Sequence, residues 1–191
     1  MPTLPCLLGL WLVALSPPAA DPAQPAAVNP TGAAVLAFKT RVADYVKIHK
    51  DAASKVPRLT ETDDPAKVHH REAALGEMIK SLRATAREGD IFGTEFRPIL
   101  EREVRSDFRS RSAADRKALI HELPARMKLA VNMSYPGDLP LATFPARLLR
   151  KLPELPPELE YRIVGRHIVL RDVTANVIVD VARDIVPTIP S

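Results

Sequence analysis

The sequence predicts an α+β protein, in which about four N-terminal helices are followed by a small antiparallel sheet with a β-hairpin and a short C-terminal helix. Two observations support this fold class. Apolar residues recur at steps of three and four up to about residue 123, and they alternate with polar residues after it. In addition, Gly165 separates two short segments rich in β-branched residues, which is typical of a turn between strands.

The first twenty residues carry no charged side chain and include an apolar run of ten, from Cys6 to Leu15. This run is too short to cross a bilayer as a helix. An N-terminal apolar run followed by small residues and prolines is typical of a secretory signal. We therefore expect residues 1–20 to be a signal peptide and the protein to be exported, either periplasmic or secreted. The alternatives are a buried N-terminal strand and a misassigned start codon.

Removal of this leader would take away the single cysteine, Cys6, and leave no disulfide and no thiolate site. Residues 21–31 contain three prolines and no apolar periodicity, which predicts a flexible linker. The rest, 32–191, is predicted to be one globular domain, helical over 32–123 and β-containing over 124–191. A chain of about 150 residues buries roughly 68–70% of its unfolded surface. We therefore expect a self-sufficient core, with no membrane span after the signal is removed.

The first predicted helix begins after the linker and ends before Pro57, because a proline pushes the preceding residue out of the helical conformation. The second is expected to start with Asp64 as the N-cap and Pro65 as the first helical residue. Its apolar positions continue to Ala86, and Gly89 is expected to end it, as glycine often does just past a helix.

The third helix is predicted to be capped by Thr94 and to run to about Arg109. Ser112 and Asp115 are three residues apart, which resembles a capping box at the start of a fourth helix. This helix is expected to run to about Leu123, since a proline follows.

The pattern then changes to a period of two, which predicts a strand over 127–135. Further along, Gly165 and Arg166 fit the centre of a type II′ turn, in which the first of the two central residues is usually glycine. This turn predicts a hairpin in which Val164 pairs with His167 and Glu160 pairs with Arg171. One face of the hairpin would then be apolar, with Tyr161, Ile163, Ile168 and Leu170. The other would carry Arg162, His167 and the Glu160/Arg171 pair.

The segment 174–186 fits both a strand and a helix, because its apolar residues satisfy either spacing. We favour a short helix capped by Asp172 or Thr174, packed on the apolar face of the sheet.

The strongest metal-site candidate lies at the start of the second helix, where carboxylates and imidazoles are mixed. Adjacent histidines on a helix point about 100° apart, so they cannot share one tetrahedral ion. We therefore favour a capped helix with exposed histidines, and expect no cofactor. The candidate set is Asp63, Asp64, His69, His70 and Glu72.

A second candidate is an arginine stripe at helical spacing, formed by Arg102, Arg105 and Arg109. Arg116 and Lys117 lie beyond it. Guanidinium groups bind phosphate or carboxylate through two parallel hydrogen bonds, so this stripe is a candidate anion-binding site. We favour the other interpretation, a solvated face of ion pairs, because acidic residues share the helix and Glu101 can pair with Arg105.

No nucleophile elbow, phosphate-binding glycine loop, dinucleotide fingerprint or H-E-x-x-H zinc motif is present. The net charge of +4 and the pI near 9.4 permit weak attraction to anionic surfaces. Nucleic-acid binding is not expected, because it needs a clustered basic face and usually aromatic platforms.

The stretches "GDIF", "VNMSYP", "LPELPPELEYRIVGR" and "LRDVTANVIVD" together resemble a group of small exported bacterial proteins, over about residues 36–187. The resemblance implies a bacterial exported domain. It transfers no site residue, since no activity, cofactor or partner is assigned to that group.

These observations favour a non-catalytic binding or structural module of the cell envelope, whose partner is another envelope protein or an anionic envelope component. This hypothesis predicts no buried cluster of titratable groups. The alternative is a metal-assisted envelope hydrolase that uses Asp63, Asp64, His69 and His70 with a distant His167. A pocket in which a carboxylate and a histidine converge with shifted pKa values would count against the non-catalytic module.

Overall fold

The computed structural model describes residues 29–121, 128–136 and 144–188. The predicted signal peptide and most of the predicted linker lie outside these residues. Within them the fold is α+β, with N-terminal helices followed by a three-stranded antiparallel sheet. No helix among them is both long and apolar enough to cross a membrane. The elements are α1 (Pro30–Lys55), α2 (Pro65–Leu82), α3 (Gly93–Ser110), α4 (Ala113–His121), α5 (Ala146–Leu149), β1 (Leu159–Val164), β2 (His167–Asp172) and β3 (Val177–Ala182).

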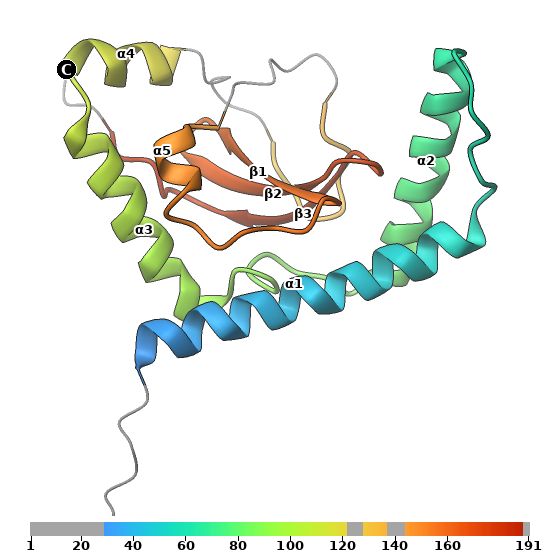
Figure 1. Cartoon of the computed structure of the whole chain (residues 1–191), viewed down its shortest axis with the longest axis horizontal. Helices are drawn as coiled ribbons and strands as arrows, with labels where there is room; N and C mark the ends of the chain where they lie inside the picture. The colour runs from blue at the N-terminus through green and yellow to red at the C-terminus, as the bar shows by residue number, and fades with distance from the viewer. Residues whose placement is uncertain (1–28, 122–127, 137–143, 189–191) are drawn as a thin grey trace, which may run out of the picture.

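The long helix α1 runs along one side of the sheet, with α2 rising from one of its ends and α3 from the other (Figure 1). The side chain of Asn29 caps α1 by accepting hydrogen bonds from the N–H groups of Thr31 and Gly32. The helix therefore begins before the expected end of the linker at residue 31. It ends at Lys55, ahead of Pro57, as predicted.

Helix α2 starts as predicted, with Asp64 accepting a hydrogen bond from the N–H of Ala66 and with Pro65 as its first residue. It ends at Leu82, however, well before Gly89. The side chain of Arg83 turns inward there and donates to the carbonyl of Val179, 3.1 Å away. This tertiary bond fixes the helix end, and the prediction that the helix continues past Ala86 was wrong.

The predicted N-cap of α3, Thr94, does not cap it, because the helix already begins at Gly93 and has no side-chain cap. The N–H groups just before it are satisfied instead by Asp180, which is fully buried in β3. Its carboxylate accepts hydrogen bonds of 2.7–2.8 Å from Gly89, Ile91 and Phe92. A carboxylate from the sheet therefore replaces the local cap, which the local sequence could not indicate.

At the start of α4, the hydroxyl of Ser112 accepts from the N–H of Asp115 and donates to its carboxylate. This confirms the predicted capping pair. The described part of the helix ends at His121, so its expected end at Leu123 lies outside the described residues.

The hairpin register is the predicted one, from Val164↔His167 to Glu160↔Arg171. Gly165 has a positive φ of 56°, whereas the φ of the next residue, Arg166, is not positive. This combination is the pattern of a type II′ turn. The predicted apolar face is buried in the main core, with Tyr161, Ile163, Ile168 and Leu170 each at most 5% exposed.

The tail is a strand, and the prediction of a C-terminal helix was wrong. β3 pairs antiparallel with β2, which gives the strand order β1-β2-β3. All six residues of β3 are buried because both faces of the sheet are covered. A strand buried on both faces shows no alternation of polar and apolar residues, so its period resembled that of a helix.

The predicted strand over 127–135 was also wrong for the described residues. Only Ser134 forms a bridge, with Val177, and Asn132 has a φ of 65° that interrupts any extended ladder. The segment nevertheless covers the second face of the sheet. There Leu129 and Tyr135 form a small cluster with four valine and isoleucine side chains: Val164, Val169, Ile178 and Val181.

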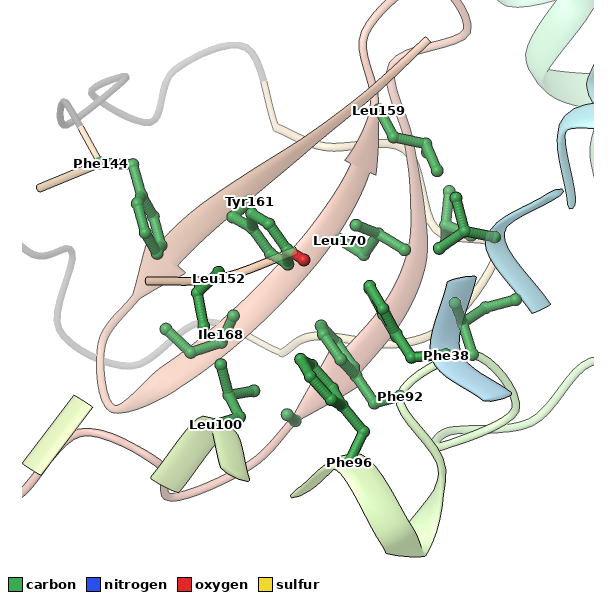
Figure 2. Packing of buried hydrophobic residues seen from close by; sticks show 14 of the residues in the cluster. Phe38, Phe92, Phe96, Leu100, Phe144, Leu152, Leu159, Tyr161, Ile168 and Leu170 are labelled. Carbon is green, nitrogen blue, oxygen red and sulfur yellow. The ribbon is translucent and has the colours of Figure 1, made fainter. Parts of the chain in front are cut away.

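The main core lies between the helices and the face of the sheet that carries Tyr161 and Ile168 (Figure 2). Phe38 of α1 stacks on Phe96 of α3 with ring centroids 4.3 Å apart, and Phe38 also stacks on Tyr161 of β1 at 6.4 Å. Stacked aromatic pairs add roughly 0.5–1.5 kcal/mol beyond the burial of their area. These contacts fix α3, and therefore its arginine residues, against the sheet.

Candidate anion-binding site

A hollow of about 510 Å³ lies where the end of α3, the start of α4, the hairpin turn and the C-terminal segment meet. Four arginine side chains line it, and the one acidic residue among its lining is Asp184. We call it the arginine hollow. Its lining residues are Arg105, Phe108, Arg109, Arg116, Arg166, Asp184, Ile185, Pro187 and Thr188.

Helix α3 supplies the first two arginines. Val104 and Phe108 are buried against the core, and this turns Arg105 and Arg109 outward on the same face, one helical turn apart. Neither guanidinium has a hydrogen-bond or ion-pair partner among the residues that the structure describes. Both groups are therefore available to a ligand.

The third arginine, Arg116, lies on α4 and is held in place by the chain itself. Its Nη1 donates to the backbone carbonyls of Arg111 at 2.8 Å and Phe108 at 3.4 Å. The capping pair at the start of α4 sets the direction in which this helix leaves α3. As a result, Arg116 is placed next to the end of α3 with most of its five N–H donors still unused.

The fourth arginine, Arg166, is the second residue of the hairpin turn. Its Nε donates to the carbonyl of Val186 at 3.1 Å, and its Nη1 lies 3.3 Å from a carboxylate oxygen of Asp184. The backbone carbonyl of Arg166 also accepts from the N–H of Val186. The hairpin turn is thus tied to the C-terminal segment, which brings Arg166 to the hollow.

The predicted stripe is therefore split by the fold. Arg105, Arg109 and Arg116 come together, whereas Arg102 points elsewhere and binds the adjacent Glu103 at 3.0 Å. Arg166 was not part of the prediction. Its position at a turn gave no signal that it would join a helix face 61 residues earlier in the chain.

Four guanidinium groups against one carboxylate create a positive potential in a recess with apolar walls. The walls are Phe108, Ile185 and Pro187, the first two of them buried. Guanidinium groups match the oxygens of phosphate and carboxylate, and they bind these more strongly where water is partly excluded. The arrangement can therefore hold an anionic group that carries an apolar part.

No family model matches the chain, and no curated protein or solved structure matches it significantly. A function can therefore be inferred only from the geometry of the chain itself.

The predicted metal-site residues lie near the start of α2 and are exposed, apart from the half-buried Glu72. Asp64 caps the helix, and His70 lines a separate hollow with three cationic side chains. His167 is remote from them on β2, and its Nδ1 accepts from the N–H of Asp184. Across the described part of the chain, no group of three or more metal-binding side chains is placed to hold an ion.

A buried titratable cluster does exist, contrary to expectation. The carboxylate of Asp172 accepts hydrogen bonds from the hydroxyl of Tyr45 at 2.7 Å and from Nδ1 of His49 at 2.6 Å. It also accepts from the N–H groups of Thr174 and Ala175, within the turn between β2 and β3. We call this set, Tyr45, His49 and Asp172, the buried triad.

The pKa values in the buried triad follow from these contacts. Burial opposes ionisation of Asp172 most strongly, yet the hydrogen bonds from His49 and Tyr45 lower its pKa overall. The hydrogen bond to Asp172 raises the pKa of His49. Burial, together with the nearby carboxylate, raises the pKa of Tyr45.

The buried triad lines neither the arginine hollow nor three other hollows formed by described residues. His49 is 8% exposed and Asp172 is fully buried. The cluster connects α1 to the end of β2. The cluster could not be predicted from local patterns, because 123 residues separate His49 from Asp172.

Proposed function

We propose that the protein is a non-catalytic binding module for an anionic component of the cell envelope, which it holds in the arginine hollow. The observation that carries this proposal is the unpaired state of Arg105 and Arg109 beside two further arginines. Like charges gathered without partners repel one another, so the arrangement gains stability once an anion is bound.

The composition of the hollow favours binding over reaction. Its lining includes neither a histidine nor a cysteine, and its one carboxylate, on Asp184, already pairs with Arg166. A general base and an activated nucleophile are the groups that acyl or phosphoryl transfer needs. The hollow can therefore orient an anion, but it lacks the groups that would attack one.

The ligand is expected to combine a phosphate or carboxylate group with an apolar portion, because the arginines surround apolar walls. Nucleic acid fits the site poorly. The large hydrophobic side chains that are exposed among the described residues are all aliphatic, so they offer no platform on which bases could stack. Export to the envelope, supported by the apolar leader of the sequence, would place the protein among anionic lipids and polymers.

The test is binding of an alkyl phosphate and of inorganic phosphate to the purified protein, measured by isothermal titration calorimetry at low salt. Replacing both unpaired arginines, R105Q with R109Q, should weaken binding at least tenfold. This follows because hydrogen bonds to charged groups contribute about 1.5–3 kcal/mol each before screening.

The matched control is R102Q, which removes the same charge from the same helix outside the hollow and should leave affinity within about twofold. Equal affinity of the wild type and the R105Q/R109Q variant would contradict the proposal. Tighter binding of the alkyl phosphate than of inorganic phosphate would support a role for the apolar walls.

A further inference from the structure

A second hollow, of about 360 Å³, lies between the connection that follows α1 and the first turns of α2. We call it the α2 hollow. We propose that it binds a small oxyanion, such as phosphate, sulfate or a carboxylate, independently of the arginine hollow. Its lining residues are Pro57, Arg58, Leu59, Thr60, Ala66, Lys67, His70, Arg71 and Ala74.

The charge of this lining is one-sided. Arg58, Lys67 and Arg71 are cationic, His70 becomes cationic on protonation, and no carboxylate is among the lining residues. The nearby Asp64 directs its carboxylate to the N–H of Ala66 as the helix cap. The hollow therefore repels a metal cation, and of the candidate metal ligands at this helix start only His70 lines it.

Arg71 provides an independent sign that a partner is missing. Its Nη1 is buried and donates no hydrogen bond. Buried donors in proteins nearly always have an acceptor, and each exception calls for an explanation such as a bound ion or water. Because Arg71 also lines the α2 hollow, an oxyanion bound there would supply the acceptor.

The other lining groups fit an oxyanion as well. Thr60 offers a hydroxyl donor, and the apolar side chains of Pro57, Leu59, Ala66 and Ala74 complete the lining without adding an acceptor that would compete for the cations. The buried Nη1 of Arg71 would interact more strongly with an anion than an exposed guanidinium does, because water is excluded from it. A small tetrahedral or planar oxyanion would therefore be held by Arg71 inside and by Arg58 and Lys67 near the opening, both of which are exposed.

Arg71 also connects the α2 hollow to the buried triad. Its positive charge lowers the pKa of His49, while the bond to Asp172 and the charge of Glu158 raise it. An anion beside Arg71 would cancel part of that positive charge, so the pKa of His49 should rise when the hollow is occupied. His49 therefore reports on this hollow from inside the protein.

The experiment is an NMR titration of the His49 imidazole in the full-length protein, with and without inorganic phosphate at constant ionic strength. Phosphate should raise the pKa of His49 measurably. The exposed pair R58Q and K67Q should weaken the apparent phosphate affinity at this site about tenfold, and R71Q should abolish the effect on His49. The control K39Q removes an exposed charge from α1 outside the hollow and should behave as the wild type.

Two outcomes would overturn this inference: a His49 titration that phosphate leaves unmoved, or a response that R58Q with K67Q does not weaken. R71Q removes a half-buried side chain and could disturb folding, so the exposed pair decides the matter if R71Q is unstable. The R105Q/R109Q variant should keep the full response of His49. The failure of either binding site can thus be distinguished from the failure of the other.

Discussion

The arginine hollow and the buried triad both bring together ionisable side chains that are distant in sequence, but they differ in whether those side chains have hydrogen-bond partners. In the buried triad, Asp172 accepts five hydrogen bonds, from Tyr45, His49 and the following turn. In the arginine hollow, Arg105 and Arg109 lie one helical turn apart, and neither has an acceptor within the described part of the chain. The buried triad therefore stabilises the fold, whereas the charges of the arginine hollow form no contact that would do so and are the groups that, in our proposal, bind an anion.

The substitution Asp172→Ala should have the largest effect on stability. Removing the carboxylate leaves the Tyr45 hydroxyl, the His49 imidazole and several N–H groups buried without an acceptor, so we expect destabilisation of about 3–5 kcal/mol. Urea denaturation monitored by circular dichroism measures this loss. Asp172→Asn keeps the shape and some acceptors, and it should lose less. If Asp172→Ala changed stability by less than about 1 kcal/mol, the triad would not be a structural tie.

The next largest effect should be the pH dependence of stability, to which the buried triad contributes through its shifted pKa values. The pKa of His49 is higher in the folded protein than in the unfolded chain, where it is about 6.5. The stability that His49 contributes is therefore fully present below about pH 6.5 and is lost as the pH rises through the pKa of the folded state. The pKa of Asp172 is lower in the folded protein than in the unfolded chain, where it is about 3.9. The stability that Asp172 contributes is therefore present above about pH 3.9 and is lost as the pH falls through the pKa of the folded state. The triad should therefore contribute most between about pH 4 and 6.5.

Denaturation curves between pH 4 and pH 9 would show this as a decline of stability on the alkaline side. His49→Gln should flatten that decline, because it removes the group that titrates. A decline of the same size in His49→Gln and in the wild type would mean that another group is responsible.

A smaller effect is expected for Tyr45→Phe. The substitution removes one hydrogen bond to Asp172 but keeps the ring beneath Arg83, whose guanidinium lies 5.1 Å from the ring centroid. We expect a loss of about 1.5–3 kcal/mol in the free energy of unfolding, the range for a hydrogen bond to a charged group. Thermal denaturation at pH 5.5 measures it. Tyr161→Phe is the matched control, because that hydroxyl donates to a single carbonyl, that of Pro153.

The smallest effect should be that of R105Q with R109Q on stability in the absence of ligand. Exposed substitutions away from structural contacts usually change stability by no more than about 0.5 kcal/mol, and relief of repulsion should make this change neutral or favourable. Adding phosphate should then stabilise the wild type more than the variant, because a ligand that binds only the folded state raises its stability. A clear loss of stability in the variant would mean that these arginines hold the fold together.

The parts of the fold that could be predicted are those governed by neighbours in sequence. The hairpin register follows from a two-residue turn at Gly165 and from alternation on either side of it. The caps at Asp64 and Ser112 follow from local side-chain chemistry. In contrast, β3 is covered on both faces, so its alternation is hidden and a helix was favoured.

The candidate site shows the same limit. Arg105 and Arg109 could be placed on one face because they are one turn apart, but Arg102 could not be excluded without knowing which way α3 packs. Arg166 reaches the arginine hollow only through the tie between the hairpin turn and the C-terminal segment. The α2 hollow could not be predicted, because Arg58 and Arg71 lie on two segments that only the tertiary fold brings together.

The tie made by Asp180 has a mechanical consequence. It holds the residues just before α3, while the arginines lie near the opposite end of that helix. A tilt of α3 against the packing of Val104 and Phe108 would have this tie as its pivot and would move the arginines most. The helix has 18 residues, which is about 27 Å, and a tilt of about 3° at its base would move its far end by about 1.4 Å. A change confined to the pivot could thus loosen the grip on a ligand without altering any residue that touches it.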